Sequence, residues 1–151
     1  MKIPDIQSSE EFLALAALIE RSGAEMYKTL AGKAGAGEMA ALFTQLAAEE
    51  EEHEKTFLSL GKMSHEPGFT EGILKKSEGS DLFSSERLSG ELAYVDDPED
   101  SLNFAIRREL DTILFYKRML QKGFDAKQII EDVIKMEEEH FYRLHQLKES
   151  L

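Results

Sequence analysis

The sequence predicts an all-α protein: a four-helix bundle in which two antiparallel helical hairpins are joined by a long crossover. Four segments carry apolar residues at the i, i+3, i+4, i+7 spacing of an amphipathic helix. The 151 residues include only three prolines, so long stretches lack the residue that interrupts helices. One glycine- and serine-rich stretch separates the first two helical segments from the last two, as in bundles with a crossover. We therefore expect one domain over residues 1–151.

The first predicted hairpin has helices over residues 8–31 and 37–60. Ser8 and Ser9 precede two glutamates, which is typical of a helix N-terminus, where hydroxyls cap free N–H groups and acidic side chains favour the helix dipole. The glycine-rich segment 31–37 is typical of a turn. The predicted apolar stripe of the first helix comprises Phe12, Ala16, Ile19, Gly23, Met26, Tyr27 and Leu30.

The second predicted hairpin has helices over residues 98–122 and 125–149. Asp97 is a suitable N-cap, and Pro98 suits the first helical position, where no N–H is needed. Gly123 marks the turn between the two helices. The crossover spans residues 61–97, and Leu88 and Leu92, four residues apart, indicate a short helix over residues 84–94 within it.

The composition excludes several classes of function. The net charge of −12 disfavours nucleic acid and anionic membranes, which require a basic surface. The absence of cysteine excludes disulfides, thiolate metal sites and iron–sulfur clusters. The longest apolar run, residues 12–19, is far shorter than the ~20 residues that span a bilayer. No signal peptide is recognisable at the start of the sequence, and we expect a cytoplasmic protein.

Charged residues interrupt all four apolar stripes. A buried unpaired carboxylate costs several kcal/mol, so a cluster of them requires a compensating positive charge. The spacing of the interrupting residues repeats, because each half of the chain has a Glu, a Tyr 7 residues later, and then a Glu-x-x-His motif. Glu and His three residues apart lie on one face of a helix. The candidate metal ligands are Glu20, Glu50, His53, Glu109, Glu137 and His140.

The four glutamates are expected to meet at one level of the bundle. The first pair lie 14 and 16 residues from the centre of their turn, and the second pair lie 14 residues on either side of theirs. Two glutamates and two Glu-x-x-His motifs form the ligand set of dinuclear carboxylate bundles. Such ligands suit iron or manganese, and zinc could substitute.

A plainer interpretation remains open for these residues, because the acidic runs 49–54 and 137–140 would suit solvated helix faces. By default, Glu25, Glu49, Glu51, Glu52, Glu54, Glu138 and Glu139 are assigned to the surface, as are His65 and His145. Tyr27 and Tyr116 are either ordinary core tyrosines or hydroxyls that orient a ligand carboxylate. Four arginines, Arg107, Arg108, Arg118 and Arg143, could balance buried charge.

In the segments 20–27, 47–53, 109–116 and 137–140 the chain resembles the rubrerythrin and ferritin-like superfamily, most of all short relatives that consist of the diiron bundle alone. The resemblance implies a ferritin-like fold, bridging carboxylates at Glu50 and Glu137, terminal ones at Glu20 and Glu109, and one histidine per metal. The chain differs from rubrerythrins in two respects. Without cysteine it contains no rubredoxin domain, and Thr112 stands where a second glutamate is common.

The leading functional hypothesis is a diiron oxidoreductase with two iron ions, which reduces hydrogen peroxide or dioxygen with electrons from an external donor. An iron-binding or ferroxidase protein for storage or delivery is the alternative, and a metal-free structural bundle is a third hypothesis. We expect neither nucleic acid nor membrane as a partner. A homodimer would cover apolar crossover residues, namely Ile73, Leu74, Leu82 and Phe83.

Overall fold

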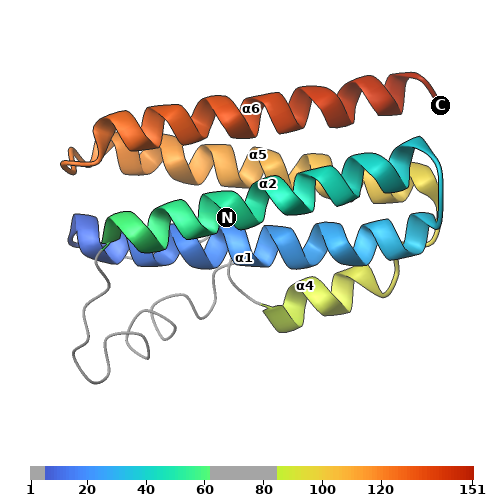
Figure 1. Ribbon diagram of the computed structural model, residues 1–151, viewed down its shortest axis with the longest axis horizontal. Coiled ribbons are helices and arrows are strands. Elements are labelled where there is room, and N and C mark those ends of the chain that lie inside the picture. Colours follow the sequence, from blue (N-terminus) through green and yellow to red (C-terminus); the bar gives the residue numbers. More distant parts are fainter. Residues whose placement is uncertain (1–5, 62–84) are drawn as a thin grey trace.

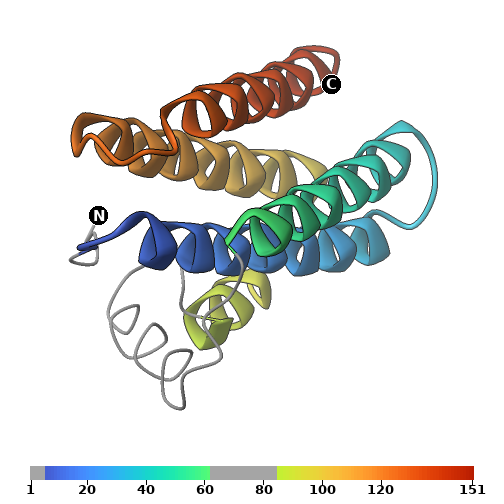
Figure 2. The same cartoon turned by 60° about the vertical axis from the view of Figure 1, so that its left-hand side comes forward.

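The computed structural model describes residues 6–61 and 85–151 (Figure 1). The described part is helical and confirms the all-α bundle that the sequence predicts. Its helices, in chain order, are α1 (Ser9–Ala34), α2 (Glu38–Gly61), α4 (Ser85–Leu92), α5 (Pro98–Gln121) and α6 (Lys127–Glu149). Helices α1 and α2 form one closely packed hairpin, and α5 and α6 form the other (Figures 1 and 2).

Capping residues define the ends of α1. The Ser8 hydroxyl accepts a hydrogen bond from the Glu11 amide at 3.1 Å, which satisfies one of the free N–H groups of the first turn. At the other end, Gly35 has a φ of 75° and donates its N–H to the Ala31 carbonyl at 3.2 Å. A residue with a side chain would be strained there, so the glycine fixes the place where the chain turns towards α2.

The second hairpin is delimited in a similar way. Asp97 accepts a hydrogen bond from the Asp100 amide at 2.7 Å, and Pro98 occupies the first helical position of α5. Gly123, with a φ of 76°, lies in the turn after α5. Helix α6 begins at Lys127, two residues later than predicted, and Ala126 at its N-cap provides no side-chain hydrogen bond.

Helix α1 is more deeply buried than its predicted stripe indicates. Helix α4 packs along α1, on the side away from α6 (Figures 1 and 2). Leu88 and Leu92 of α4 belong to the core. Those two leucines share a cluster with Met26, Tyr27 and Leu30 of α1. Leu13, Ala14 and Ala17 belong to the other apolar cluster and are buried although they lie off the stripe. The predicted stripe was therefore too narrow, because it assumed a helix with one solvated face.

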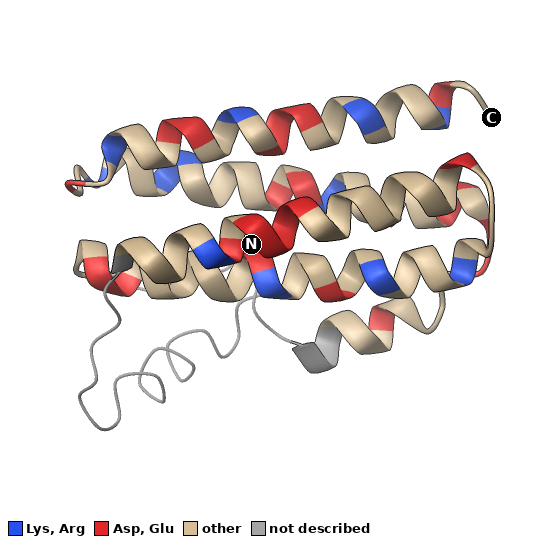
Figure 3. Cartoon of the chain, viewed as in Figure 1, with Lys and Arg blue, Asp and Glu red and all other residues tan. Residues whose placement is uncertain are grey.

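Two apolar clusters occupy the two ends of the bundle. One contains Phe12, Phe57, Phe115 and Ile130, and the other contains Tyr27, Phe43, Leu46, Leu102 and Leu144. Between them, acidic residues gather near the middle of α2, α5 and α6 (Figure 3). The apolar clusters thus enclose a polar layer at mid-bundle.

Several predictions fall on residues 62–84, which lie outside the described residues. They concern His65 and the apolar residues Ile73, Leu74, Leu82 and Phe83. Within the described residues, no helix is both long enough and apolar enough to cross a membrane.

Candidate metal centre

Each of the four long helices contributes one buried glutamate to the polar layer. Glu20 comes from α1, Glu50 from α2, Glu109 from α5 and Glu137 from α6, and none is more than 3% exposed. Four carboxylates at this depth would repel one another strongly if all were ionised. The arrangement therefore calls for bound cations, protons or both.

The ligand atoms fall into two overlapping groups. One comprises Glu20, Glu50, His53 and Glu137, and the other comprises Glu50, Glu109, Glu137 and His140. Within each group the candidate ligand atoms lie within 4.8 Å of one another. Glu50 and Glu137 belong to both groups, so the geometry is that of two neighbouring positions that share two carboxylates. We call them the His53 position and the His140 position.

The two histidines direct Nδ1 at the carboxylates. His53 Nδ1 lies 3.5 Å from Glu20 and 3.7 Å from Glu137. His140 Nδ1 lies 3.3 Å from Glu50 and 3.5 Å from both Glu109 and Glu137. The imidazole rings are nearly parallel, with centroids 5.7 Å apart. Each Glu-x-x-His motif thus brings its glutamate and histidine to the same point, as three-residue spacing on a helix requires.

Buried polar atoms without a hydrogen-bond partner are concentrated at this point. Among the described residues they include atoms of five of the six candidate ligands: Glu20 Oε2, His53 Nδ1, Glu109 Oε2, both Glu137 oxygens and His140 Nδ1. Native proteins rarely leave buried polar atoms unpaired, and a missing ion is one explanation for such a group. The donor set therefore fits a pair of divalent cations.

The pKa values of the metal-free site also reflect the crowding of buried carboxylates. Burial alone would lower the pKa of each imidazole, but nearby carboxylates outweigh burial and raise the pKa to about 9 for His53 and about 10 for His140. Burial and the charge of Glu137 raise the pKa of Glu109 to about 8. Without metal, protons bound to these groups offset part of the negative charge.

Two tyrosines connect the hairpins. Tyr27 on α1 donates a hydrogen bond to Glu109 on α5, and Tyr116 on α5 donates to Glu20 on α1 at 2.9 Å. Each tyrosine therefore holds the glutamate of the opposite hairpin. Burial first, and then nearby carboxylate charge, raises the pKa of both phenols well above 10.0, so both stay protonated donors. This supports the prediction that they orient ligand carboxylates and shows that the contact crosses between hairpins.

Arg108 is the buried arginine that sequence reasoning could not place. It is 8% exposed on α5, and its guanidinium donates to the Thr112 hydroxyl at 2.8 Å and to the Ile19 carbonyl at 3.4 Å. Its charge partly opposes the rise in the pKa of Tyr27 and Tyr116, so it lies close enough to act on both. Thr112 thus anchors a fixed cation beside the site.

Gly23 was predicted as part of the stripe of α1, but its importance to the site was missed. A Cβ atom there would lie 3.3 Å from Cδ of Glu50, which is closer than most real contacts of this kind, so the glutamate would have to shift slightly. The glycine therefore makes room for a shared carboxylate. A glycine inside an otherwise apolar helix was the available signal.

Three glutamates of α2 that were assigned to the surface are only partly exposed. Glu49, Glu51 and Glu54 each pair with a cation from another helix. The cations are Arg143, Lys28 and Arg21, in that order. Glu25, Glu52, Glu138, Glu139 and His145 are exposed, as predicted.

Comparison with known proteins agrees with this geometry. The sequence model of the Rubrerythrin family matches residues 11–148, which include all six candidate ligands and both tyrosines. Neither a curated protein nor a solved structure matches the chain. The Rubrerythrin domain is a ferritin-like helical bundle that generally binds a diiron centre, so the fold implied by the resemblance is confirmed. Because the match covers nearly the whole chain, the protein belongs to the Rubrerythrin family.

Proposed function

We propose that this protein is a non-haem diiron oxidoreductase, which reduces hydrogen peroxide or dioxygen with electrons from an external donor. The observation that carries the proposal is the pair of overlapping ligand groups that share Glu50 and Glu137. Two positions with common carboxylates would hold two metals close together, and such a pair would supply two electrons in one reaction.

The six candidate residues would hold the two irons, with Glu20 and His53 at one position and Glu109 and His140 at the other. Reduction of one hydrogen peroxide to two waters consumes two protons and two electrons, and bound iron would supply the electrons as two Fe(II) ions become two Fe(III) ions. The apolar clusters at both ends of the bundle exclude bulk water from the site.

The tyrosines have a distinct role in this proposal. A protonated phenol that donates to Glu20 or Glu109 fixes the carboxylate in one orientation. Arg108 adds a fixed positive charge beside the site, which partly compensates the four glutamates.

The test begins with metal content. Protein loaded anaerobically with Fe(II) should bind two irons per chain, and one hydrogen peroxide should oxidise both, as followed by the absorbance of Fe(III). Repeated turnover with an added reductant would support an oxidoreductase. Uptake of iron far beyond two per chain would instead support storage.

The matched variants are Glu50→Ala and Glu52→Ala. Both remove one carboxylate from α2, but Glu50 is 3% exposed and Glu52 is exposed. Glu50→Ala should lose iron and peroxide reactivity, whereas Glu52→Ala should keep both. Two irons and full oxidation in Glu50→Ala would refute the proposal. Less than one metal per chain in the native protein, with no stabilisation by Fe(II) or Mn(II), would favour a structural bundle.

A further inference from the structure

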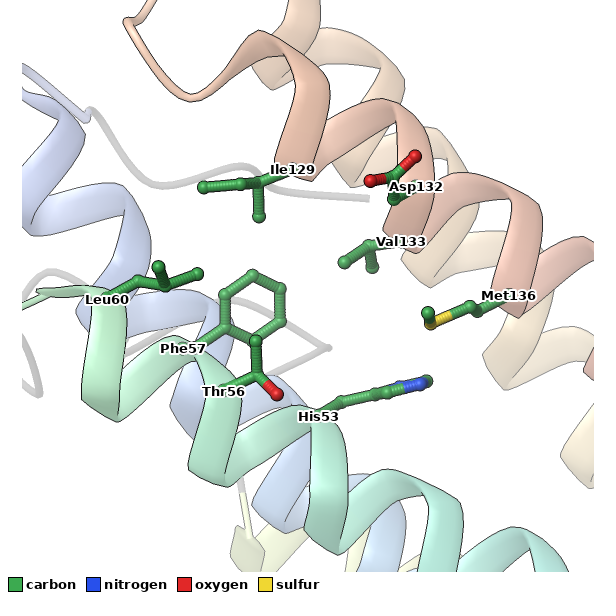
Figure 4. A pocket seen from close by; sticks show the side chains of 8 residues that line it. All are labelled: His53, Thr56, Phe57, Leu60, Ile129, Asp132, Val133 and Met136. Carbon is green, nitrogen blue, oxygen red and sulfur yellow. The ribbon is translucent and has the colours of Figure 1, made fainter.

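A pocket lies between α2 and α6, beside the candidate metal centre. Its volume is about 160 Å³. Figure 4 shows side chains of both helices projecting into it. Its apolar walls are formed by Phe57, Leu60, Ile129, Val133 and Met136, and His53 adjoins the metal centre. We call it the α2–α6 pocket.

The pocket contacts the metal centre through one candidate ligand, His53. The side chain of His53 is 13% exposed, whereas that of His140 is 2% exposed. The pocket residues of α2 follow His53 at intervals of three and four residues, so they extend from the ligand along one face of the helix. The pocket therefore leads from the protein surface to one of the two metal positions.

The corresponding surface over His140 is closed by an ion pair. Glu49 immediately precedes the shared glutamate of α2, and Arg143 lies three residues after His140 on α6. One guanidinium nitrogen of Arg143 donates to both Glu49 oxygens, at 2.9 and 2.8 Å. Glu49 also lies 3.8 Å from Nε2 of His140. A charged pair from two helices thus covers the His140 position.

Uncharged residues occupy the matching places over His53. Met136 immediately precedes the shared glutamate of α6, and Thr56 lies three residues after His53 on α2. Both line the α2–α6 pocket. The repeat that makes the ligands alike in the two halves therefore does not extend to these covering residues. One side has an ion pair, and the other has a thioether, a hydroxyl and an open space.

The lining indicates what the pocket admits. A water molecule takes up about 30 Å³ of liquid, so the pocket holds only a few molecules of that size. Its walls are apolar, and loss of hydration would be costly for an ion that enters it. Asp132 is the one carboxylate that lines it, and its charge disfavours anions. A small uncharged molecule loses little hydration on entry and is not repelled by Asp132.

We infer that the α2–α6 pocket is the route by which a small uncharged oxidant reaches the metal centre, with Met136 and Thr56 as the residues that limit its size. The inference rests on the proposed function, and the size and apolar lining of the pocket suit the small uncharged oxidants named there, hydrogen peroxide and dioxygen. It also makes the His53 position the one that meets the oxidant first.

The test uses nitric oxide, a small uncharged molecule that binds Fe(II) without turnover. In anaerobic stopped-flow experiments with iron-loaded protein, Met136→Trp should slow association by about tenfold or more, because packed side chains leave no space for diffusion. Lys135→Trp is the matched control. It places the same ring one residue away on α6, beside Leu120 and Ile134 in a separate pocket that contains no candidate ligand.

A second variant closes the pocket with an ion pair like the one that covers His140. Thr56→Arg together with Met136→Glu copies the Glu49–Arg143 pair onto the His53 side, and it should slow nitric oxide in the same way. Association as fast as in the native protein, in folded variants with two irons, would overturn the inference. Slow association only in the pocket variants would support it.

Metal-free crystals provide a measurement that does not depend on iron. Xenon under pressure should occupy the α2–α6 pocket of the native protein and be absent from Met136→Trp. An empty native pocket would count against the inference.

Two outcomes separate the route from the proposed function. If native iron-loaded protein does not react with peroxide while nitric oxide association is still slowed in the variants, the proposed function fails and the route stands. If peroxide oxidises the Trp variant at the native rate, the route fails and the function stands.

Discussion

The His53 and His140 positions have the same kinds of ligand but different surroundings. Each has one terminal glutamate, one histidine and a share of Glu50 and Glu137. Outside this set the similarity ends, because an ion pair covers His140 while a pocket adjoins His53. The comparison teaches that an internal repeat can preserve a set of candidate ligands while the surroundings of its two halves differ. Under the proposal, the His53 position meets the oxidant and the His140 position remains enclosed.

The largest expected effect separates shared from terminal carboxylates. Glu137→Ala should abolish binding at both positions, because Glu137 belongs to both groups. Glu20→Ala and Glu109→Ala should each leave about one iron per chain, since each removes a ligand from a single position. Iron content after gel filtration checks this, with the exposed Glu138→Ala as the control. If both terminal variants lost all iron, the two positions would not be separable.

The tyrosines offer a sharper test, because each acts on the opposite hairpin. Tyr116→Phe should weaken the His53 position, since Tyr116 donates to Glu20, and Tyr27→Phe should weaken the His140 position through Glu109. Loss of an outer hydrogen bond to a ligand typically costs 10–100-fold in metal affinity, and we expect about that much here.

The measurement uses a background with a single position. In Glu109→Ala, Tyr116→Phe should weaken the remaining site, and Tyr27→Phe should have little effect. Isothermal titration with Mn(II) gives both affinities. Tyr94→Phe is the control for loss of a phenol, because Tyr94 is 85% exposed. Equal weakening by both core variants would show that the tyrosines act through the bundle as a whole.

The pH dependence gives a third prediction, for the metal-free protein. The pKa values rise from 6.5 to about 9 for His53, from 6.5 to about 10 for His140, and from 4.5 to about 8 for Glu109. In each case the folded state binds more protons than the unfolded state, so stability falls as pH rises through these intervals. The melting temperature in chelator should therefore decrease steadily from pH 6 to pH 9, and an increase would contradict it.

Metal binding should reverse this trend. Cations displace protons from the three groups at pH 7, so binding releases protons and strengthens as pH rises. Carboxylates raise the pKa of both histidines, so proton release is expected at both positions. Zn(II) titration with a pH indicator present should show protons released at pH 7, and binding without proton release would contradict this.

Much of the fold could be predicted from local patterns. The Gly35 and Gly123 turns, the Asp97 cap and the spacing of the apolar stripes each depend on a few neighbouring residues. The height of the glutamates follows from their distance to these turns. For the same reason, the two Glu-x-x-His motifs could be identified and expected to converge.

The remaining features depend on which helices become neighbours. The contact between α4 and α1 joins segments that are far apart in the sequence, and the tyrosine contacts require the two hairpins to face each other. The pairing of Glu49 with Arg143 joins α2 and α6 across 94 residues, so a run of glutamates could not reveal it. Arg108 is similar, because nothing in its local sequence distinguishes it from Arg107, which is exposed.

The smallest effect concerns the closed side of the metal centre. Glu49→Met together with Arg143→Thr gives the His140 side the residues found over His53. The lost ion pair is partly exposed, so we expect a cost of at most about 1 kcal/mol in the free energy of unfolding. Urea denaturation checks this cost. Lys28→Met is the control, because it breaks a different ion pair of α2, the one with Glu51.

The informative measurement is nitric oxide association in a variant that combines Glu49→Met and Arg143→Thr with Met136→Trp. If the ion pair is what encloses the His140 position, its replacement should restore part of the nitric oxide association that the tryptophan removes. The restoration should be incomplete, because the side chain of His140 is 2% exposed whereas that of His53 is 13% exposed. No restoration in a folded, iron-loaded variant would mean that the packing of α6 against α5, rather than Arg143, closes that side. The functional difference between the two positions would then be a property of the bundle and not of two side chains.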